Sequence, residues 1–185
     1  MLKRFIHRKL RAFEQAHGYD GSYMHELLDT DVLAFFKFAR ATRLSTYRRD
    51  VPAEAVAAAG LTSSVAADCG PCTQLGVGFA LAAGVAPATV RAIISGDEAA
   101  LPADAALAAR FARAVLARDA AMDALREEVV DRWGRRAVVS LAYAVMSAQL
   151  YPALKYAMGH GKACTRVVVA GQAIAPGRHL AAGAA

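Results

Sequence analysis

Alanine content is the feature of this sequence that most constrains its fold. Alanine accounts for 45 of the 185 residues, and it is the best helix former and a poor strand former. Hydrophobic residues make up 56% of the chain and aromatic residues 8%, a composition that excludes disorder over most of the length. We therefore predict an all-α protein that folds as one compact helical bundle.

Basic charge is concentrated at the N-terminus. The first eleven residues contain five lysines and arginines and no acidic residue, so the rest of the chain holds 17 basic and 16 acidic residues against a total net charge of +6. The body is thus almost neutral. Because nucleic-acid binding surfaces are strongly basic, we expect no nucleic-acid partner.

The N-terminal segment also has the periodicity of an amphipathic helix. Its basic residues fall on one face and its apolar residues on the other; the apolar ones are Leu2, Phe5, Ile6, Leu10 and Phe13. We predict a basic helical arm over residues 1–20 that ends near Gly18. Residues 1–17 could contact an anionic membrane surface peripherally, but we favour packing on the protein's own body or on a neighbouring subunit. A transit peptide fits less well, because serine is nearly absent.

Two uncharged stretches, Thr73–Val90 and Ala137–Leu154, are long enough to span a membrane. Glycines and a proline weaken the first as a helix, and Gln149 and Pro152 interrupt the second. Buried helices of an alanine-rich bundle are the better interpretation. No secretory signal follows the basic start, and three cysteines are too few for a disulfide scaffold. We expect a cytoplasmic protein.

Capping residues, prolines and glycines predict where the other helices lie. Asp29 or Thr30 is expected to cap a helix that runs to about Thr46. A first helical turn tolerates proline and a glycine often follows the last turn. On this basis we expect further helices from Ala53 towards Ala67, over Pro87–Gly96, after Pro102, from about Asp123 to Gly134, and over Arg135–Met158.

These elements give a simple domain organisation. The arm precedes one helical domain over residues 21–160. Residues 161–185 lose helical periodicity and form an irregular tail, in which Val167–Val169 favours a short strand.

The sequence Cys69-Gly70-Pro71-Cys72 is the local pattern that carries chemistry. Two thiols at this spacing can close a small disulfide ring when the second lies in the first turn of a helix, where Pro71 also fits. Unpaired amide groups at a helix start stabilise a thiolate. A thiolate is the nucleophile in disulfide exchange and in attack on a peroxide, so we predict a redox-active dithiol.

Other interpretations of the cysteines stay open. They could be inert buried residues, or part of a zinc site with His160 and Cys164. Thioredoxins carry the same four letters, but there the pair follows a buried strand. The alanine-rich segment from Ala53 to Ala67 contains no strand-like run, so that fold is disfavoured.

The order of elements around the cysteines resembles the alkylhydroperoxidase D-like, carboxymuconolactone decarboxylase family over about His25 to Gly159. The resemblance depends on Cys-x-x-Cys at the head of a Gly/Ala-rich helix (Cys69–Gly84), the phrase Gly-Val-x-Pro-x-x-Val (Gly84–Val90) and a long helix over Asp104–Arg118. It implies a helical bundle of that type, a homo-oligomer, and reduction of a hydroperoxide or disulfide substrate at the expense of a thiol reductant. It implies no cofactor.

The resemblance also implies roles for individual residues. Cys72 would attack the substrate and Cys69 would resolve the oxidised intermediate. The family relays protons through a glutamate and a histidine, but this chain has Ala57 and Gly76 at those positions. We predict Glu54, one helical turn before Ala57, as a substitute relay.

Two more polar side chains are candidates for the site, because the oxygen that leaves the hydroperoxide has no obvious proton donor. His25 could enter from elsewhere in the fold, and Gln74 could orient water. The loss of the relay also favours an alternative, a non-catalytic helical assembly or binding protein that keeps the family scaffold. Lactone decarboxylation is not expected, because the family members with that activity lack the cysteine pair.

Overall fold

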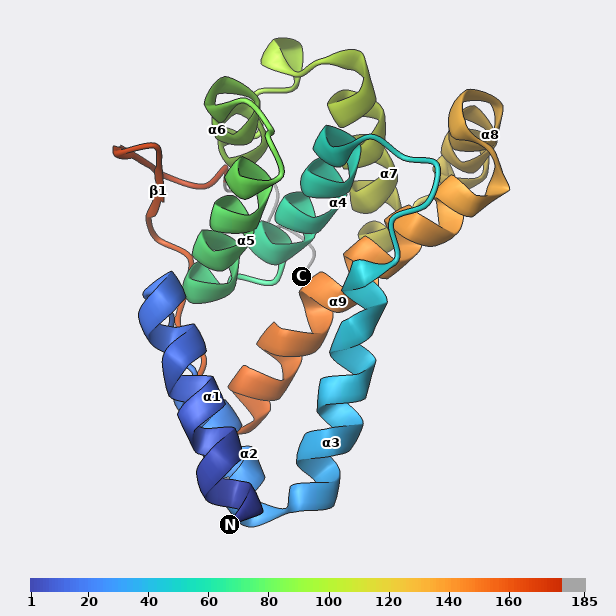
Figure 1. Ribbon diagram of the computed structural model, residues 1–185. Coiled ribbons are helices and arrows are strands. Elements are labelled where there is room, and N and C mark those ends of the chain that lie inside the picture. The colour runs from blue at the N-terminus through green and yellow to red at the C-terminus, as the bar shows by residue number, and fades with distance from the viewer. Residues whose placement is uncertain (178–185) are drawn as a thin grey trace.

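The computed structural model describes residues 1–177 and confirms that this part of the chain is mostly helical, with one short hairpin (Figure 1). The α-helices are α1 (Leu2–His17), α2 (Ser22–Thr30), α3 (Val32–Ala41), α4 (Ala53–Ala66), α5 (Gly70–Ala82), α6 (Pro87–Ser95), α7 (Ala103–Ala117), α8 (Met122–Trp133) and α9 (Arg135–Ala157). Two 3-10 helices, η1 (Thr42–Thr46) and η2 (Glu98–Ala100), and two strands, β1 (Val167–Val169) and β2 (Gln172–Ile174), complete the fold.

Most helix boundaries lie where the sequence predicts them. Gly18 and Gly96 adopt left-handed backbone after α1 and α6, a conformation that glycine adopts without steric cost. Pro52 and Pro102 stand directly before α4 and α7. In the predicted tail over 161–185, the strand at Val167–Val169 is confirmed and pairs antiparallel with β2; residues 178–185 of that tail lie outside the described residues.

The helix expected from Asp29 or Thr30 to about Thr46 begins later than predicted, and although the helical run ends at Thr46, its last part is the 3-10 helix η1. Asp31 is the cap instead, and its carboxylate accepts hydrogen bonds from the second and third backbone amides of α3 at 2.6 and 3.1 Å. At the other end the Thr42 hydroxyl donates to the carbonyl three residues earlier at 2.9 Å. Such local side-chain bonds compete with α-helical ones, and the chain tightens into η1.

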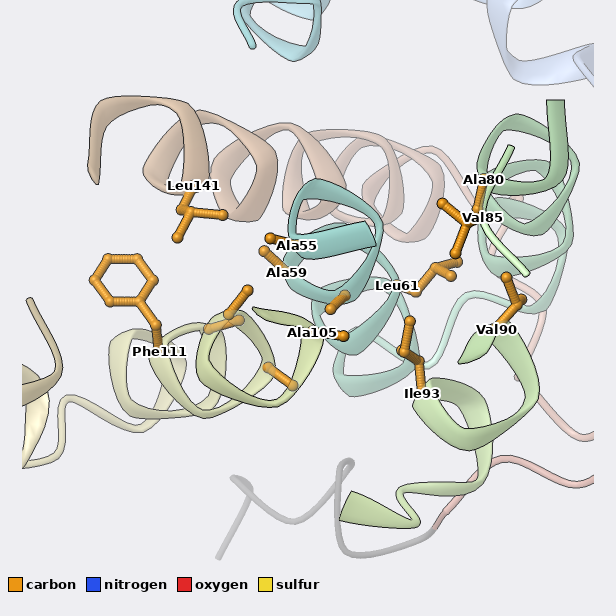
Figure 2. Packing of buried hydrophobic residues seen from close by; sticks show 14 of the residues in the cluster. Ala55, Ala59, Leu61, Ala80, Val85, Val90, Ile93, Ala105, Phe111 and Leu141 are labelled. Atoms are coloured by element: carbon orange, nitrogen blue, oxygen red, sulfur yellow. The ribbon is translucent and has the colours of Figure 1, made fainter. Parts of the chain in front are cut away.

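Helix α4 is the centre of the bundle and packs against α5, α6, α7 and α9 (Figure 2). Ala55 and Ala59 are fully buried between α7 and α9, where small side chains let helix axes approach to about 8–10 Å. The helix runs unbroken through Gly60. Its Ser63 and Ser64 hydroxyls donate to carbonyls four residues earlier, at 2.7 and 3.0 Å, so these buried polar groups are satisfied.

Among residues 1–177, α9 is the one helix that is long and apolar enough to cross a membrane, by length and composition alone. It packs on α4 and buries Ala137, Leu141 and Val145. The other uncharged stretch, Thr73–Val90, is not one helix, because the chain turns through Gly84 with φ +83° between α5 and α6.

The predicted arm is helix α1, which extends with α2 and α3 away from the rest of the bundle (Figure 1). No residue of α1 is buried, and Leu2 and Phe5 remain about half exposed. Helix α3 likewise exposes Leu33 and Phe36. Contact of the arm with a membrane or with another subunit stays a prediction.

Candidate functional site

The two cysteines lie at the start of α5, as the sequence predicts, and form a disulfide. Cys69 is the N-cap, and its sulfur accepts a hydrogen bond from the Cys72 amide at 3.4 Å. Cys69 is buried, with 1% of its surface exposed, whereas Cys72 is partly exposed and borders a cavity. Cys72 is therefore the sulfur that a small molecule can reach.

A segment close to the C-terminus fixes the turn that precedes the pair. Asp68 has left-handed backbone with φ +50°, and its carboxylate accepts a hydrogen bond from the Cys164 amide at 2.7 Å. The Tyr156 hydroxyl donates to the Asp68 carbonyl at 2.9 Å, and the Gly70 amide donates to the Lys162 carbonyl at 3.1 Å. The Asp68 carboxylate is thus engaged by backbone next to the cysteines.

Gly70→Ala is expected to destabilise this turn. An added Cβ would lie 2.8 Å from the Ala163 carbonyl oxygen, a backbone atom that cannot rotate away. We expect a loss of about 1–3 kcal/mol in the free energy of unfolding, measured by urea denaturation. Gly78→Ala, also on α5 but with open space around its Cβ, is the matched control and should be stabilising by about 0.8–1 kcal/mol. Equal effects of the two substitutions would contradict the proposed contact.

Cys72 borders a cavity of about 670 Å³ that is lined mainly by apolar side chains. This volume is within the range of about 300–1,000 Å³ that is typical of small-molecule sites. One wall is a stripe along α4 whose members recur every three or four residues, the spacing of one helix face: Ala53, Val56, Ala57, Gly60, Leu61 and Ser64. Helices α1, α2, α3, α5 and α9 supply the other walls.

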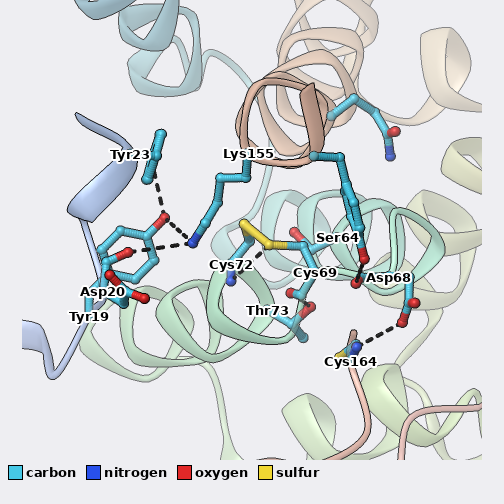
Figure 3. Close-up of a disulfide and its surroundings, with 12 residues drawn as sticks. Tyr19, Asp20, Tyr23, Ser64, Asp68, Cys69, Cys72, Thr73, Lys155 and Cys164 are labelled. Atoms are coloured by element: carbon cyan, nitrogen blue, oxygen red, sulfur yellow. Dashed lines mark hydrogen bonds between the residues drawn. A yellow bond between two sulfur atoms is a disulfide. The ribbon is translucent and has the colours of Figure 1, made fainter. Parts of the chain in front are cut away.

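A buried lysine contacts two tyrosines that line the Cys72 cavity. Lys155 of α9 is 1% exposed, and its ammonium is 4.7 Å from the ring centroid of Tyr19 and 5.0 Å from that of Tyr23, distances typical of cation–π contacts. It donates to the Tyr19 hydroxyl at 3.4 Å and to the Asp20 carbonyl at 3.5 Å. Figure 3 shows the side chain running between the two tyrosines and the cysteine pair.

Burial sets the acid–base properties of this group. It lowers the pKa of Lys155, and the nearby Asp20 carboxylate opposes that shift. Burial also raises the pKa values of Tyr19 and Tyr23, whose hydroxyls are bonded to each other at 3.3 Å. Both tyrosines line the Cys72 cavity. Sequence reasoning missed all three residues.

A second polar group reaches the cavity from α1. Glu14 lines it, accepts a hydrogen bond from the Gly21 amide at 3.0 Å and is bonded to His25 at 3.3 Å. His25 in turn contacts His7, and His7 contacts Asp29 at 2.9 Å. His25 therefore lies behind Glu14, and it is not among the residues that line the cavity.

The structure does not bring Glu54 to the cysteines. Glu54 lies in the first turn of α4, whereas the carbonyl that accepts from the Cys69 amide belongs to Ser64. Ten residues of helix, or about 15 Å, separate the two. Ala57 and Gly76, the positions that the sequence resemblance assigns to relay residues, both line the cavity.

Position 76 is packed closely against Leu61. A Cβ on Gly76 would lie 2.9 Å from a methyl carbon of Leu61, a core residue that is 2% exposed.

Gln74 binds strand β1 instead of orienting water. Its side-chain amide donates to the Val168 carbonyl at 2.9 Å and accepts from the Val168 backbone amide at 2.8 Å.

The residues considered for zinc do not converge. His160 is bonded to Glu26 at 2.7 Å and to Ser22 at 3.1 Å, while Cys69 and Cys72 are bonded to each other. Over residues 1–177, no group of three or more His, Cys, Asp or Glu side chains has the arrangement of a metal site. The cysteine pair follows helix α4 and not a strand, which is unlike the thioredoxin arrangement.

Comparisons with protein-family models, with curated proteins and with solved structures found no match.

Proposed function

We propose that the protein is a thiol-dependent oxidoreductase that reduces hydroperoxides through Cys72 and Cys69 on a helical scaffold of the alkylhydroperoxidase D-like type. The observation that carries this proposal is the asymmetry of the pair. Cys72 borders an apolar cavity, while Cys69 is buried and bonded to it. The accessible sulfur would attack the substrate, and the buried sulfur would capture the product of that attack.

The chemistry balances with one hydroperoxide and two thiols. The Cys72 thiolate attacks the outer oxygen of the hydroperoxide, the O–O bond breaks, and that oxygen stays on Cys72 as a sulfenic acid. The alkoxide takes up one proton and leaves as an alcohol. The Cys69 thiol then attacks the Cys72 sulfur, so that the disulfide forms and water leaves. A thiol reductant supplies the two electrons and two protons that restore both thiols.

Backbone and side chain would both favour the attacking thiolate. Cys72 lies in the first turn of α5, at the positive end of the helix dipole. The Lys155 ammonium beside the pair would stabilise the negative sulfur and, through the Tyr19 hydroxyl that it contacts, would return a proton to the departing alkoxide. Lys155 would thus replace the family's relay, for which this chain has Ala57 and Gly76.

Stoichiometric oxidation tests the proposal. Protein that has been fully reduced and freed of reductant is mixed with cumene hydroperoxide, thiols are counted by alkylation and mass spectrometry, and the alcohol product is quantified. We expect one Cys69–Cys72 disulfide and one alcohol per hydroperoxide consumed, with Cys164 still alkylated. The proposal fails if Cys69 and Cys72 both remain alkylatable after the peroxide is added.

A specific observation favours a second candidate, a non-catalytic binding or assembly protein. Neither Ala57 nor Gly76 can carry a proton, although both line the cavity. A protein that binds apolar ligands in the cavity but consumes no hydroperoxide would match this alternative. A homo-oligomer fits either function, and the exposed Leu33 and Phe36 of α3 are suited to a subunit contact.

A further inference from the structure

We infer that the Cys72 cavity binds an amphiphilic anion, an apolar chain whose carboxylate or phosphate head lies against Arg43 and Arg48. This inference depends on the proposed function only for the reaction that follows binding. If the proposed function holds, the substrates are hydroperoxides of fatty-acid type. The binding itself needs no redox chemistry.

The basic end of the site is a short segment rich in arginine. Between residues 40 and 49 the chain has four arginines and no acidic residue. All four line a cleft of about 580 Å³ together with Tyr47 and Tyr143. The nearly neutral body thus has a strong local concentration of positive charge: Arg40, Arg43, Arg48 and Arg49.

These guanidinium groups have N–H donors left for a ligand; Arg48 Nε donates to the Ser45 carbonyl at 3.2 Å, and its terminal N–H groups remain. In the described part of the chain, none of the four makes an ion pair, whereas Arg110, Arg132 and Arg136 do. The adjacent acid, Asp50, is bound by Arg136 at 2.6 Å. Arginines recognise carboxylates and phosphates by paired N–H donors, so an anionic head is the group that this cleft is suited to bind.

The backbone that carries the arginines is held in place. The Arg49 amide donates to the Ser140 hydroxyl at 2.8 Å, and that hydroxyl is also 2.9 Å from the Arg49 carbonyl. The Tyr47 and Tyr143 rings pack edge to face with centroids 5.7 Å apart. The segment is therefore anchored to α9 on both sides of Arg48, which lowers the cost of ordering it around a ligand.

The basic cleft and the Cys72 cavity are adjacent. Arg43, Thr46 and Arg48 line both. The other charged side chain that lines the Cys72 cavity, Glu14, is already engaged by the Gly21 amide and by His25. A ligand in this apolar cavity therefore meets positive charge where the two spaces adjoin.

Arg48 and Cys72 lie near opposite ends of α4, and the distance between those ends defines the length of the ligand. Arg48 precedes α4, and Ala53 at the start of that helix lines the cavity; Ser64 lines the other end, where its carbonyl accepts from Cys69. The wall between Ala53 and Ser64 is eleven residues of helix, or about 16 Å. An extended chain with its head at Arg48 would bring its middle or far carbons, and a hydroperoxide on them, to Cys72.

Calorimetric titration of the oxidised protein with decanoate, decyl phosphate and decanol tests the binding. We expect both anions to bind at least tenfold more tightly than decanol. Arg43→Gln/Arg48→Gln should weaken the anions at least tenfold and leave decanol unchanged. Arg135→Gln, at an exposed arginine of α9 outside both spaces, should change nothing.

A second variant tests the apolar part independently of charge. Gly60 lines the cavity and has open space where a Cβ would project. Gly60→Leu should therefore fill the cavity and weaken decanoate and decanol alike, by at least threefold. Equal binding of decanoate and decanol to the native protein overturns the inference, and so does binding to phosphatidylglycerol vesicles without binding of monomeric decanoate.

Kinetics separate this inference from the proposed function. Reduction of a linoleate hydroperoxide should show a KM at least tenfold lower than that of its methyl ester, and the double arginine variant should remove the difference. If decanoate binds as expected but no hydroperoxide is reduced, the proposed function fails and the binding site stands. If cumene hydroperoxide is reduced but the linoleate hydroperoxide and its ester are equivalent, the inference about the substrate fails alone.

Discussion

Cys72→Ser is expected to abolish hydroperoxide reduction, with a loss of at least 10³-fold, because a hydroxyl cannot replace the thiolate that attacks the O–O bond. Cys69→Ser should stop the cycle one step later. Its Cys72 should still be oxidised once, and the sulfenic acid should persist because the resolving sulfur is absent. The sulfenic acid is detected as a dimedone adduct by mass spectrometry.

Cys164→Ser is the matched control for both variants. Cys164 is the remaining thiol of the chain, it is not part of the disulfide, and burial raises its pKa, so it is a poor nucleophile. We expect its substitution to leave turnover within twofold of the native rate. A dimedone adduct on Cys69 in the Cys72→Ser protein, or rapid turnover by that protein, would reverse the assigned roles.

The parts of the site that the sequence predicted are those that depend on neighbours along the chain. Proline, the Cys-x-x-Cys spacing and the apolar run after Cys72 place both cysteines at a helix start, and the structure confirms that position. The boundary near Asp31 was missed by one or two residues, because several acidic and hydroxyl residues there can each cap a helix.

Long-range contacts could not be predicted in the same way. Lys155 ends an uncharged stretch, where a lysine is typical of an exposed helix terminus. Its burial depends on Tyr19, a residue 136 positions earlier, and on the docking of α2 against the end of α9. Glu54 is a further case, because it lies in the first turn of α4 while the far end of that helix contacts Cys69. It is also not among the residues of α4 that line the cavity.

Overall charge was also misleading about local charge. The sum of 17 basic and 16 acidic residues outside the N-terminus predicts no basic surface, yet four of those bases lie within ten residues and line one cleft. Most of the acids that balance them pair elsewhere, as Glu98 does with Arg113 and Asp104 with Arg132. A net charge near zero is therefore compatible with an anion site.

Lys155→Met is expected to slow the oxidation of Cys72 about 10²-fold at neutral pH. Methionine keeps the length of the buried side chain and removes the charge that would stabilise the thiolate and return the proton. The pH–rate profile should also shift to higher pH, since the Cys72 thiol loses a cationic neighbour. Stopped-flow measurement of peroxide consumption gives both quantities, and an unchanged profile would leave Lys155 with a structural role only.

The same variant should change how stability depends on pH. Burial lowers the pKa of Lys155 in the folded protein. At any pH between that lowered pKa and the unfolded pKa of about 10.4, the unfolded chain therefore binds more protons than the folded one. The free energy of unfolding then rises with pH across this window, by at most about 1.4 kcal/mol per unit for this one group. Below the lowered pKa both states are protonated and the contribution is constant.

The groups around Lys155 define the pH range of the measurement: Tyr19, Tyr23, Asp20 and Lys162. Tyr151 acts on the two tyrosines. The disulfide does not titrate in the oxidised protein. Burial raises the pKa values of the tyrosines. They therefore oppose the rise of stability with pH only above about pH 10, where unfolded tyrosines ionise. Urea unfolding between pH 7 and 9.5 should therefore show a stability difference, native minus Lys155→Met, that increases with pH. Lys37→Met, at an exposed lysine of α3, should show a constant difference. A flat difference for Lys155→Met would mean that its amine is solvated in the folded protein. The proton-returning role would then have to pass to Glu14, which lines the same cavity and is bonded to His25.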